Sequence, residues 1–456
     1  MATDRPVAYA SGPGHTGSFR EQVAQFQSGA STPRDYLERF LDQIGQSDGE
    51  IQAFVTLTVD AAREAADASG KRYLDGNPVS PIDGLPLGLK DIIQTGGVPT
   101  QSGSPIYKDW VPERDSPVTA ALKRDGAVIV GKTATTEFAA GAVTPARNPY
   151  DPARTPGTSS SGSAAAVGDG MVPVAVGTQL MSSVMRPASY CGHVGVKPTY
   201  GAIRQDAIHP FSPSGEHVGA HAHALEDAWH LLRQLAHGAG PVPGSRGLTG
   251  PVELPDARQP RRLMRMYTPG WELAENSVRE ALEAALDRLA DAGVEIVEPD
   301  SAPELATVEQ DFAQADWCIA EVSAFEMRWP FLEYEAEGHS FHPRIGKLLD
   351  RAHEITLADY HTALDWKDGF RDRYRAIAET VDGVIGLTAP EIAPEGLENI
   401  GHPVMCSPAS CMGAPSLSLP TLHADGLPLG LQLVGFHGAD ADMFAQARWI
   451  DDALAN

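Results

Sequence analysis

The stretch Pro156-Gly157-Thr158-Ser159-Ser160-Ser161-Gly162-Ser163 is the most informative part of this chain. A second serine pair follows in Ser182-Ser183-Val184-Met185-Arg186-Pro187, and an upstream segment, Gly84 to Asp91, carries Lys90 at the end of an apolar run. Hydroxyl groups supply nucleophiles and proton relays, and a buried lysine supplies a base that can be neutral. Together these segments predict covalent acyl transfer that does not depend on histidine.

Lys90 follows Leu85, Leu87 and Leu89, whose alternation predicts a strand that enters the core. Burial disfavours the charged form of lysine and lowers its pKa, which a general base near neutral pH requires. The alternative is a surface lysine paired with Asp91.

The serines at 159–163 lie among glycines, a composition that lets backbone amides approach a ligand. The alternatives are a flexible loop and a phosphate-binding nest, although the spacing of a P-loop is absent. Ser182 and Ser183 follow an expected strand, where a serine at a strand-to-helix turn can face a substrate. The pattern is not a G-x-S-x-G elbow, and spacing alone does not choose between the two serines.

The composition is that of a globular protein, with 42% apolar and 21% charged residues. A net charge of −25 disfavours binding to nucleic acid or anionic membranes. Four cysteines, too few for a disulfide framework, predict reduced thiols. Neither a signal pattern nor a membrane-length apolar run is seen, so we expect a cytoplasmic protein.

Short apolar runs alternate with helical patterns over residues 80–240, which indicates an α/β sheet covered on both faces. A helix is expected to begin at Ser31-Thr32-Pro33-Arg34, and a single long helix is expected from Glu272 to Ala292. Residues 303–380 are expected to be almost entirely helical. Their aromatic residues either pack in the core or wall a substrate pocket: Trp317, Phe325, Trp329, Phe331, Tyr334 and Trp366.

These segments and several others resemble the amidase signature family, which uses a Ser–cis-Ser–Lys triad. The further matching segments are Val130 to Thr133, Arg147 to Pro152, Cys191-Gly192, Val196 to Gly201 and Asp425 to Gly435. The resemblance covers roughly residues 30–240 and 380–455.

The resemblance implies that Ser183 is the nucleophile, Ser159 the proton relay and Lys90 the neutral base. The backbone N–H groups of Leu180, Met181, Ser182 and Ser183 match the family's oxyanion hole. The family's cis peptide bond corresponds to Thr158-Ser159.

The nucleophile loop departs from the commonest family pattern. Gln179 replaces an aspartate, as in a subgroup with glutamine there, and Met185 replaces an arginine. Met181 and Ser182 replace glycines, and a backbone with positive φ would resist these side chains.

The expected fold is a single α/β/α amidase-signature domain over residues 1–456, with a mixed central sheet. We expect an N-terminal helical arm at 1–75, the signature core at 76–240, a linker and mostly helical insertion at 241–380, and a return to the core sheet at 381–456.

The expected activity is hydrolysis of a carboxylic amide C–N bond, with an aryl amide or a carbamate (urethane) as candidate substrates. No cofactor or metal is expected. The partner would be a small-molecule amide or carbamate, not nucleic acid or a membrane, and a homodimer is one option for the assembly.

Three alternative hypotheses remain open. A metal site could use His217, His221 and His223 with Glu216, Glu226 and Asp227, although no established zinc spacing is present. The chain could be a glutaminase-type subunit of an amidotransferase complex. It could also be a non-catalytic binding protein on an amidase scaffold, which would have no need of Lys90, Ser159 and Ser183 together.

Overall fold

The computed structural model describes residues 17–141 and 143–455. Eleven strands form one sheet in the order β1-β3-β2-β4-β6-β5-β10-β11-β9-β7-β8. The strands are β1 Phe54–Leu57, β2 Pro86–Lys90, β3 Val128–Thr133, β4 Val174–Gln179, β5 Val194–Lys197, β6 His217–Ala222, β7 Arg262–Arg265, β8 Glu295–Val297, β9 Gly383–Leu387, β10 Ser416–Ala424 and β11 Leu427–Val434. Parallel pairs around β2 and β7 combine with antiparallel pairs elsewhere, so the sheet is mixed, as predicted.

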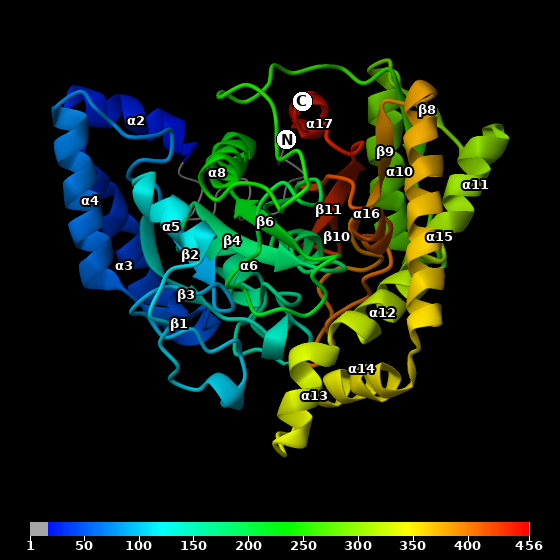
Figure 1. Ribbon diagram of the computed structural model, residues 1–456. Coiled ribbons are helices and arrows are strands. Elements are labelled where there is room, and N and C mark those ends of the chain that lie inside the picture. Colours follow the sequence, from blue (N-terminus) through cyan, green and yellow to red (C-terminus); the bar gives the residue numbers. More distant parts are fainter. Residues whose placement is uncertain (1–16, 142, 456) are drawn as a thin grey trace.

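Helices surround this sheet (Figure 1). The N-terminal set is α2 Phe19–Ser28, α3 Pro33–Ile51 and α4 Val59–Leu74. The central set is α5 Pro117–Arg124, α6 Ser161–Gly168, α7 Met185–Tyr190, α8 Leu225–Gly238, α9 Gly270–Leu273 and α10 Asn276–Asp291. The later helices are α11 Pro303–Phe312, α12 Ala315–Glu326, α13 Arg328–Ala336, α14 Pro343–Glu354, α15 Leu357–Ala376, α16 Ser407–Met412 and α17 Asp440–Ala455. In Figure 1 the N-terminal set lies at the left end of the sheet, and α10, α11 and α15 lie at the right.

Alternate residues of β4 show that both faces of the sheet are covered. Val174 and Val176 belong to one apolar cluster with α8, α10 and α17, whereas Ala175 belongs to a second cluster with α3, α4 and α6. Side chains of a strand alternate between faces, so the two clusters lie on opposite sides of the sheet. The predicted α/β fold with two covered faces is confirmed.

The helix expected at Ser31 to Arg34 is confirmed. Thr32 caps α3: its side chain accepts from the Asp35 N–H, while the Asp35 carboxylate accepts from the Thr32 N–H. Pro33 occupies the first helical position, where a missing N–H costs nothing. Residues 1–16 of the expected N-terminal arm lie outside the described residues.

The prediction of a single helix from Glu272 to Ala292 is wrong. The chain forms α9 and α10 with an extended break at Ala274 and Glu275. Beside the break, the guanidinium groups of Arg265 and Arg279 lie over the Trp271 ring at 4.8 and 5.2 Å. Cation–π contacts of this kind stabilise Trp271 in the short helix α9, and a continuous helical pattern in the sequence does not reveal such tertiary contacts.

Among the described residues, no helix combines the length and the apolar character that crossing a bilayer requires.

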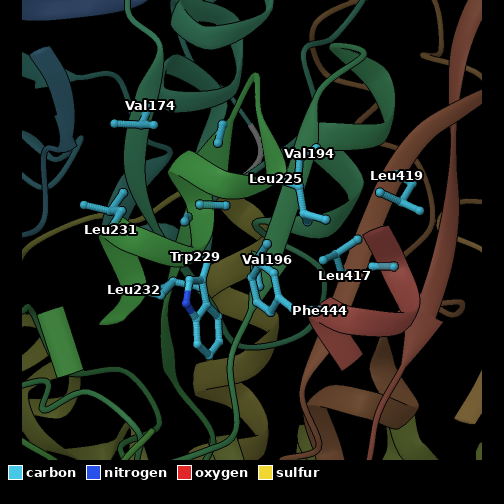
Figure 2. Close-up of a cluster of buried hydrophobic side chains, with 14 of the residues drawn as sticks. Val174, Val194, Val196, Leu225, Trp229, Leu231, Leu232, Leu417, Leu419 and Phe444 are labelled. Atoms are coloured by element: carbon cyan, nitrogen blue, oxygen red, sulfur yellow. The ribbon is translucent and has the colours of Figure 1, made fainter. Parts of the chain in front are cut away.

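The C-terminal helix α17 packs against the sheet through Phe444 (Figure 2). Phe444 is fully buried and meets Trp229 of α8 with ring centroids 4.9 Å apart. Leu417 of β10 and Val196 of β5 belong to the same cluster. The closing segment of the chain therefore contributes directly to the main core.

Replacing Phe444 by alanine is expected to lower the free energy of unfolding by about 3–5 kcal/mol, because it removes a buried ring and leaves a cavity. Urea unfolding followed by circular dichroism measures this change. Val252→Ala serves as control, since Val252 is 55% exposed and its loss should cost less than about 0.5 kcal/mol. Equal midpoints for the two variants would contradict this packing.

Candidate active site

The fold brings Lys90, Ser159 and Ser183 together from three segments. Lys90 is the last residue of β2, and Ser183 lies between β4 and α7. Because β2 and β4 are parallel neighbours, their carboxyl ends meet at one edge of the sheet. Ser159 lies just before α6, and the N–H of its neighbour Ser160 donates to the carbonyl of Ser183 at 3.3 Å.

The serine-rich loop is a packed structural element, so the flexible-loop alternative is wrong. Ser159 is 2% exposed, and the Thr158-Ser159 peptide bond is cis, as predicted. Gly157 has a φ of +82°, and a Cβ there would meet Pro187. A Cβ on Gly162 would overlap backbone atoms of Ala134 and Ala53. Glycines at these two positions let the loop press against the neighbouring backbone.

Lys90 is completely buried and bonds to hydroxyl groups. Its Nζ donates to Ser159 Oγ at 2.7 Å and to Thr178 Oγ1 at 2.8 Å. Burial lowers the pKa of Lys90 to about 7, while the negative charge of Glu216 opposes this shift. The amine is therefore able to exist in its neutral form near neutral pH.

The alternative that Lys90 pairs with Asp91 at the surface is wrong. Asp91 pairs with Lys132 of the adjacent strand β3, at 3.6 Å. Lys132 Nζ also donates to Thr100 Oγ1 at 2.8 Å.

A cavity of about 260 Å³ opens beside Ser159 and Ser183. Its apolar wall includes Phe138, Phe211, Ile319, Leu348, Leu180 and Met181. Charged side chains also line it: Arg186, Glu216, Arg344 and Lys347. The helical insertion contributes to this wall through α12 and α14.

The six aromatic residues singled out in the insertion do not line this cavity. Phe331 packs in the core, whereas Trp329 is 62% exposed. The aromatic wall comes instead from Phe138 and Phe211 in the signature core. A pattern of aromatic residues along a helix did not reveal which of them face the cavity.

Gln179 holds the loop that carries Ser183. Its Oε1 accepts from the backbone N–H groups of Val184 and Met185 at 2.8 and 3.0 Å. Its Nε2 donates to Ser410 Oγ at 2.9 Å, and that hydroxyl donates to the Met181 carbonyl at 2.7 Å. Sequence reasoning missed Ser410, which lies on α16 far along the chain.

The side chains of Met181 and Ser182 are accommodated without a left-handed backbone, since neither residue has a positive φ. Within the described part of the chain, no protein acceptor bonds to the backbone N–H groups of Leu180, Met181, Ser182 or Ser183. Four amide donors in one loop at the cavity wall are thus available to an oxygen atom of a ligand.

Thr178 and Arg186 also escaped the sequence analysis as contacts of the site. The Thr178 hydroxyl accepts a hydrogen bond from Lys90 Nζ. Arg186 Nη2 donates to the Thr158 carbonyl and hydroxyl at 3.3 and 3.1 Å, which fixes the residue before Ser159. Thr178 and Arg186 fall inside the family-like segment Gly177 to Pro187, so the sequence placed them near the nucleophile but did not reveal their hydrogen-bond partners.

The structure does not bring the suggested metal ligands together. His217 Nδ1 faces the Gln179 carbonyl at 3.3 Å, and His221 Nδ1 lies 2.9 Å from His193 Nε2. Among the described residues, the one group with ligand atoms close enough for a cation is Glu226, His230 and Glu253, away from Ser183.

Comparison with known proteins identifies the family of this chain. The family model Amidase matches residues 35–444. The chain is 31% identical to a glutamyl-tRNA(Gln) amidotransferase subunit of Chloroflexus aurantiacus (strain ATCC 29366 / DSM 635 / J-10-fl), covering 90% of this chain and 91% of that protein. It is 32% identical to the corresponding subunit from Anaeromyxobacter sp. (strain K), covering 96% of each.

Solved structures of amidases and related proteins have the same fold. A crystal structure of an amidase superposes with a TM-score of 0.81 at 26% identity, covering 96% of this chain and 99% of that one. A protein from a vestigial complex that reveals the origins of an s-triazine catabolic enzyme gives 0.82 at 27% identity, covering 95% and 97%. Because the family model matches most of the chain, the chain belongs to the amidase signature family of amide hydrolases.

Proposed function

We propose that this chain hydrolyses the C–N bond of a small carboxylic amide through an ester on Ser183. The observation that carries the proposal is the buried Lys90 amine, 2.7 Å from Ser159 Oγ, beside the serine loop of the cavity. Ser183 attacks the carbonyl carbon, and its proton passes through Ser159 to neutral Lys90. The same relay returns a proton to the leaving amine, and water then releases the acid and regenerates Ser183.

The N–H groups of Leu180, Met181, Ser182 and Ser183 would stabilise the negative oxygen of the tetrahedral intermediate. Amide donors already oriented toward developing charge lower the barrier without reorganisation. Gln179 and Ser410 keep this loop in position through the contacts described above.

The apolar wall favours a substrate with an aryl or apolar substituent, since Phe138, Phe211 and Leu348 line the cavity. An aryl amide and an aryl carbamate both fit this description, and the same nucleophile serves both. An amine leaving group with low basicity, such as an aniline, also needs less help from the proton relay.

A glutaminase-type activity within an amidotransferase complex is the second candidate. Curated relatives that match over 90% or more of this chain include amidotransferase subunits. Arg344 and Lys347 line the cavity, and no carboxylate of the described residues forms an ion pair with either side chain. These cations would suit a substrate that carries a carboxylate, as glutamine does.

A substrate panel separates these candidates. The isolated chain is expected to hydrolyse a neutral anilide or aryl carbamate without partner subunits. A fluorophosphonate should block this turnover and add its mass to Ser183, with no adduct in Ser183→Ala. Turnover of glutamine alone, abolished in Arg344→Ala, would instead support the second candidate. Failure of every amide, carbamate and glutamine to react would contradict both.

The rate of anilide hydrolysis should depend on pH through Lys90. Below pH 7 the amine is protonated and cannot accept a proton, so kcat/KM is expected to rise through about pH 7 and level off above it. Since the negative charge of Glu216 favours protonated Lys90, Glu216→Gln should move the midpoint to lower pH. Burial raises the pKa of Glu216 to about 7 as well, so the midpoint of the pH profile reflects the coupled titration of Lys90 and Glu216.

Lys90→Met should reduce kcat/KM by roughly 100-fold or more, since general base catalysis is lost. Lys123→Met is the control, because Lys123 is an exposed lysine paired with Asp115. Wild-type rates in a folded Lys90→Met variant would exclude lysine as the base.

Gln179→Ala should lower kcat by roughly tenfold or more and leave KM nearly unchanged, because the loop loses its acceptor for two backbone N–H groups. The matched control is Gln446→Ala, which removes another buried glutamine, on α17, that bonds to the Asp382 carbonyl at 3.1 Å. Both variants should lose stability, and only Gln179→Ala should lose kcat. Equal kcat values would show that Gln179 has no positioning role.

A further inference from the structure

Two buried thiols line one small cavity near the loop that carries Ser183. Cys318 is on α12 and Cys411 is on α16, and both are free and buried. Both line a small cavity between these helices and belong to the same buried apolar cluster. Cys318 Sγ also lies 3.4 Å from the Ala363 carbonyl of α15.

A lysine and an arginine lie near the two thiols. Lys367 lines the same cavity, is 4% exposed, and donates to the Ser214 carbonyl at 3.1 Å. No carboxylate of the described residues forms an ion pair with it. The neighbouring thiol of Cys411 lowers the pKa of Cys318, burial opposes this shift, and Lys367 and Arg371 lower the pKa further. The pKa of Cys411 is raised. Two thiols that line one cavity can serve as an attacking group and its resolving partner.

A small oxidant would reach these thiols from the substrate side. Leu180, Ile319 and Ser323 line both the thiol cavity and the cavity beside Ser183. These shared side chains separate the two spaces, so a peroxide molecule in the larger cavity needs to pass only this layer to reach Cys318.

The chain connects Cys411 directly to a contact of the loop 180–183, whose N–H groups form the proposed oxyanion hole. Cys411 follows Ser410, whose hydroxyl donates to the Met181 carbonyl at 2.7 Å and accepts from Gln179 at 2.9 Å. A disulfide fixes the separation and direction of the two Cβ atoms. Drawing Cys411 toward α12 would therefore move Ser410 relative to Met181.

We propose that Cys318 and Cys411 form a reversible disulfide when the protein meets hydrogen peroxide, and that this bond switches off amide hydrolysis by displacing Ser410. The thiolate of Cys318 attacks one peroxide oxygen, the O–O bond breaks, and a sulfenic acid and water result after protonation. The Cys411 thiol then attacks that sulfur, the S–O bond breaks, and a second water leaves. The two thiols together lose two electrons, which reduce one peroxide molecule to two water molecules. The regulatory half of this proposal depends on the proposed hydrolytic function, whereas the disulfide itself does not.

The test treats the reduced full-length chain with hydrogen peroxide, quenches free thiols with an alkylating agent, and maps peptides without reduction. The expected product is a cross-linked pair of peptides that contain Cys318 and Cys411, lighter than the free pair by two hydrogen atoms. In parallel, kcat/KM for an anilide should fall by roughly tenfold or more and return after treatment with dithiothreitol.

Cys318→Ser and Cys411→Ala should each keep the basal activity and lose both the cross-link and the peroxide sensitivity. Cys406→Ser is the matched control, because Cys406 is also buried and bonds to the Thr388 carbonyl at 3.1 Å. This variant should still form the cross-link and still lose activity with peroxide. Absence of the cross-link in the wild type would overturn the disulfide, even if no amide substrate is found. A cross-link that leaves kcat/KM unchanged would overturn the switch.

Discussion

The burial of Lys90 is the constraint on which the rest of this site depends. An ammonium group carried into the centre of a covered sheet loses its hydration, and no carboxylate of the described residues pairs with it. The neutral amine avoids this cost and satisfies its hydrogen bonds with the hydroxyls of Ser159 and Thr178. The glycine-rich loop and the Gln179 contacts can then be understood as the means of bringing two serines to this amine.

A second buried lysine shows that burial alone does not define the site. Lys132 lies on the neighbouring strand and is as deeply buried as Lys90. It has Asp91 at 3.6 Å, however, and its other contacts are to Thr100 and a backbone carbonyl. Burial lowers its pKa to about 8. Lys90 differs in what it touches: a serine hydroxyl at the edge of a cavity instead of a carboxylate within the core.

The sequence predicted the parts of this protein that local pattern controls. Apolar runs predicted β2 and the strand β4 that precedes Ser182, and the Ser31 to Arg34 segment predicted the start of α3. It did not predict β6, because His217-Val218-Gly219-Ala220-His221-Ala222 has no apolar run. Its polar rings are accommodated only by tertiary contacts such as that between His221 and His193. The roles of the three proposed catalytic residues came from family resemblance. Ser410 could not be found in this way, because its contacts with Gln179 and Met181 join segments that are far apart in the sequence.

The central claim is that Lys90 is an uncharged base near neutral pH, and its titration tests that claim most directly. The protein would be labelled with ¹³C at lysine Cε, and the Lys90 signal would be assigned by its loss in Lys90→Met. We expect a midpoint near pH 7 for this signal, well below that of the exposed Lys123. A Lys90 signal that stays in the ammonium form up to about pH 10, as an ordinary lysine does, would contradict the claim.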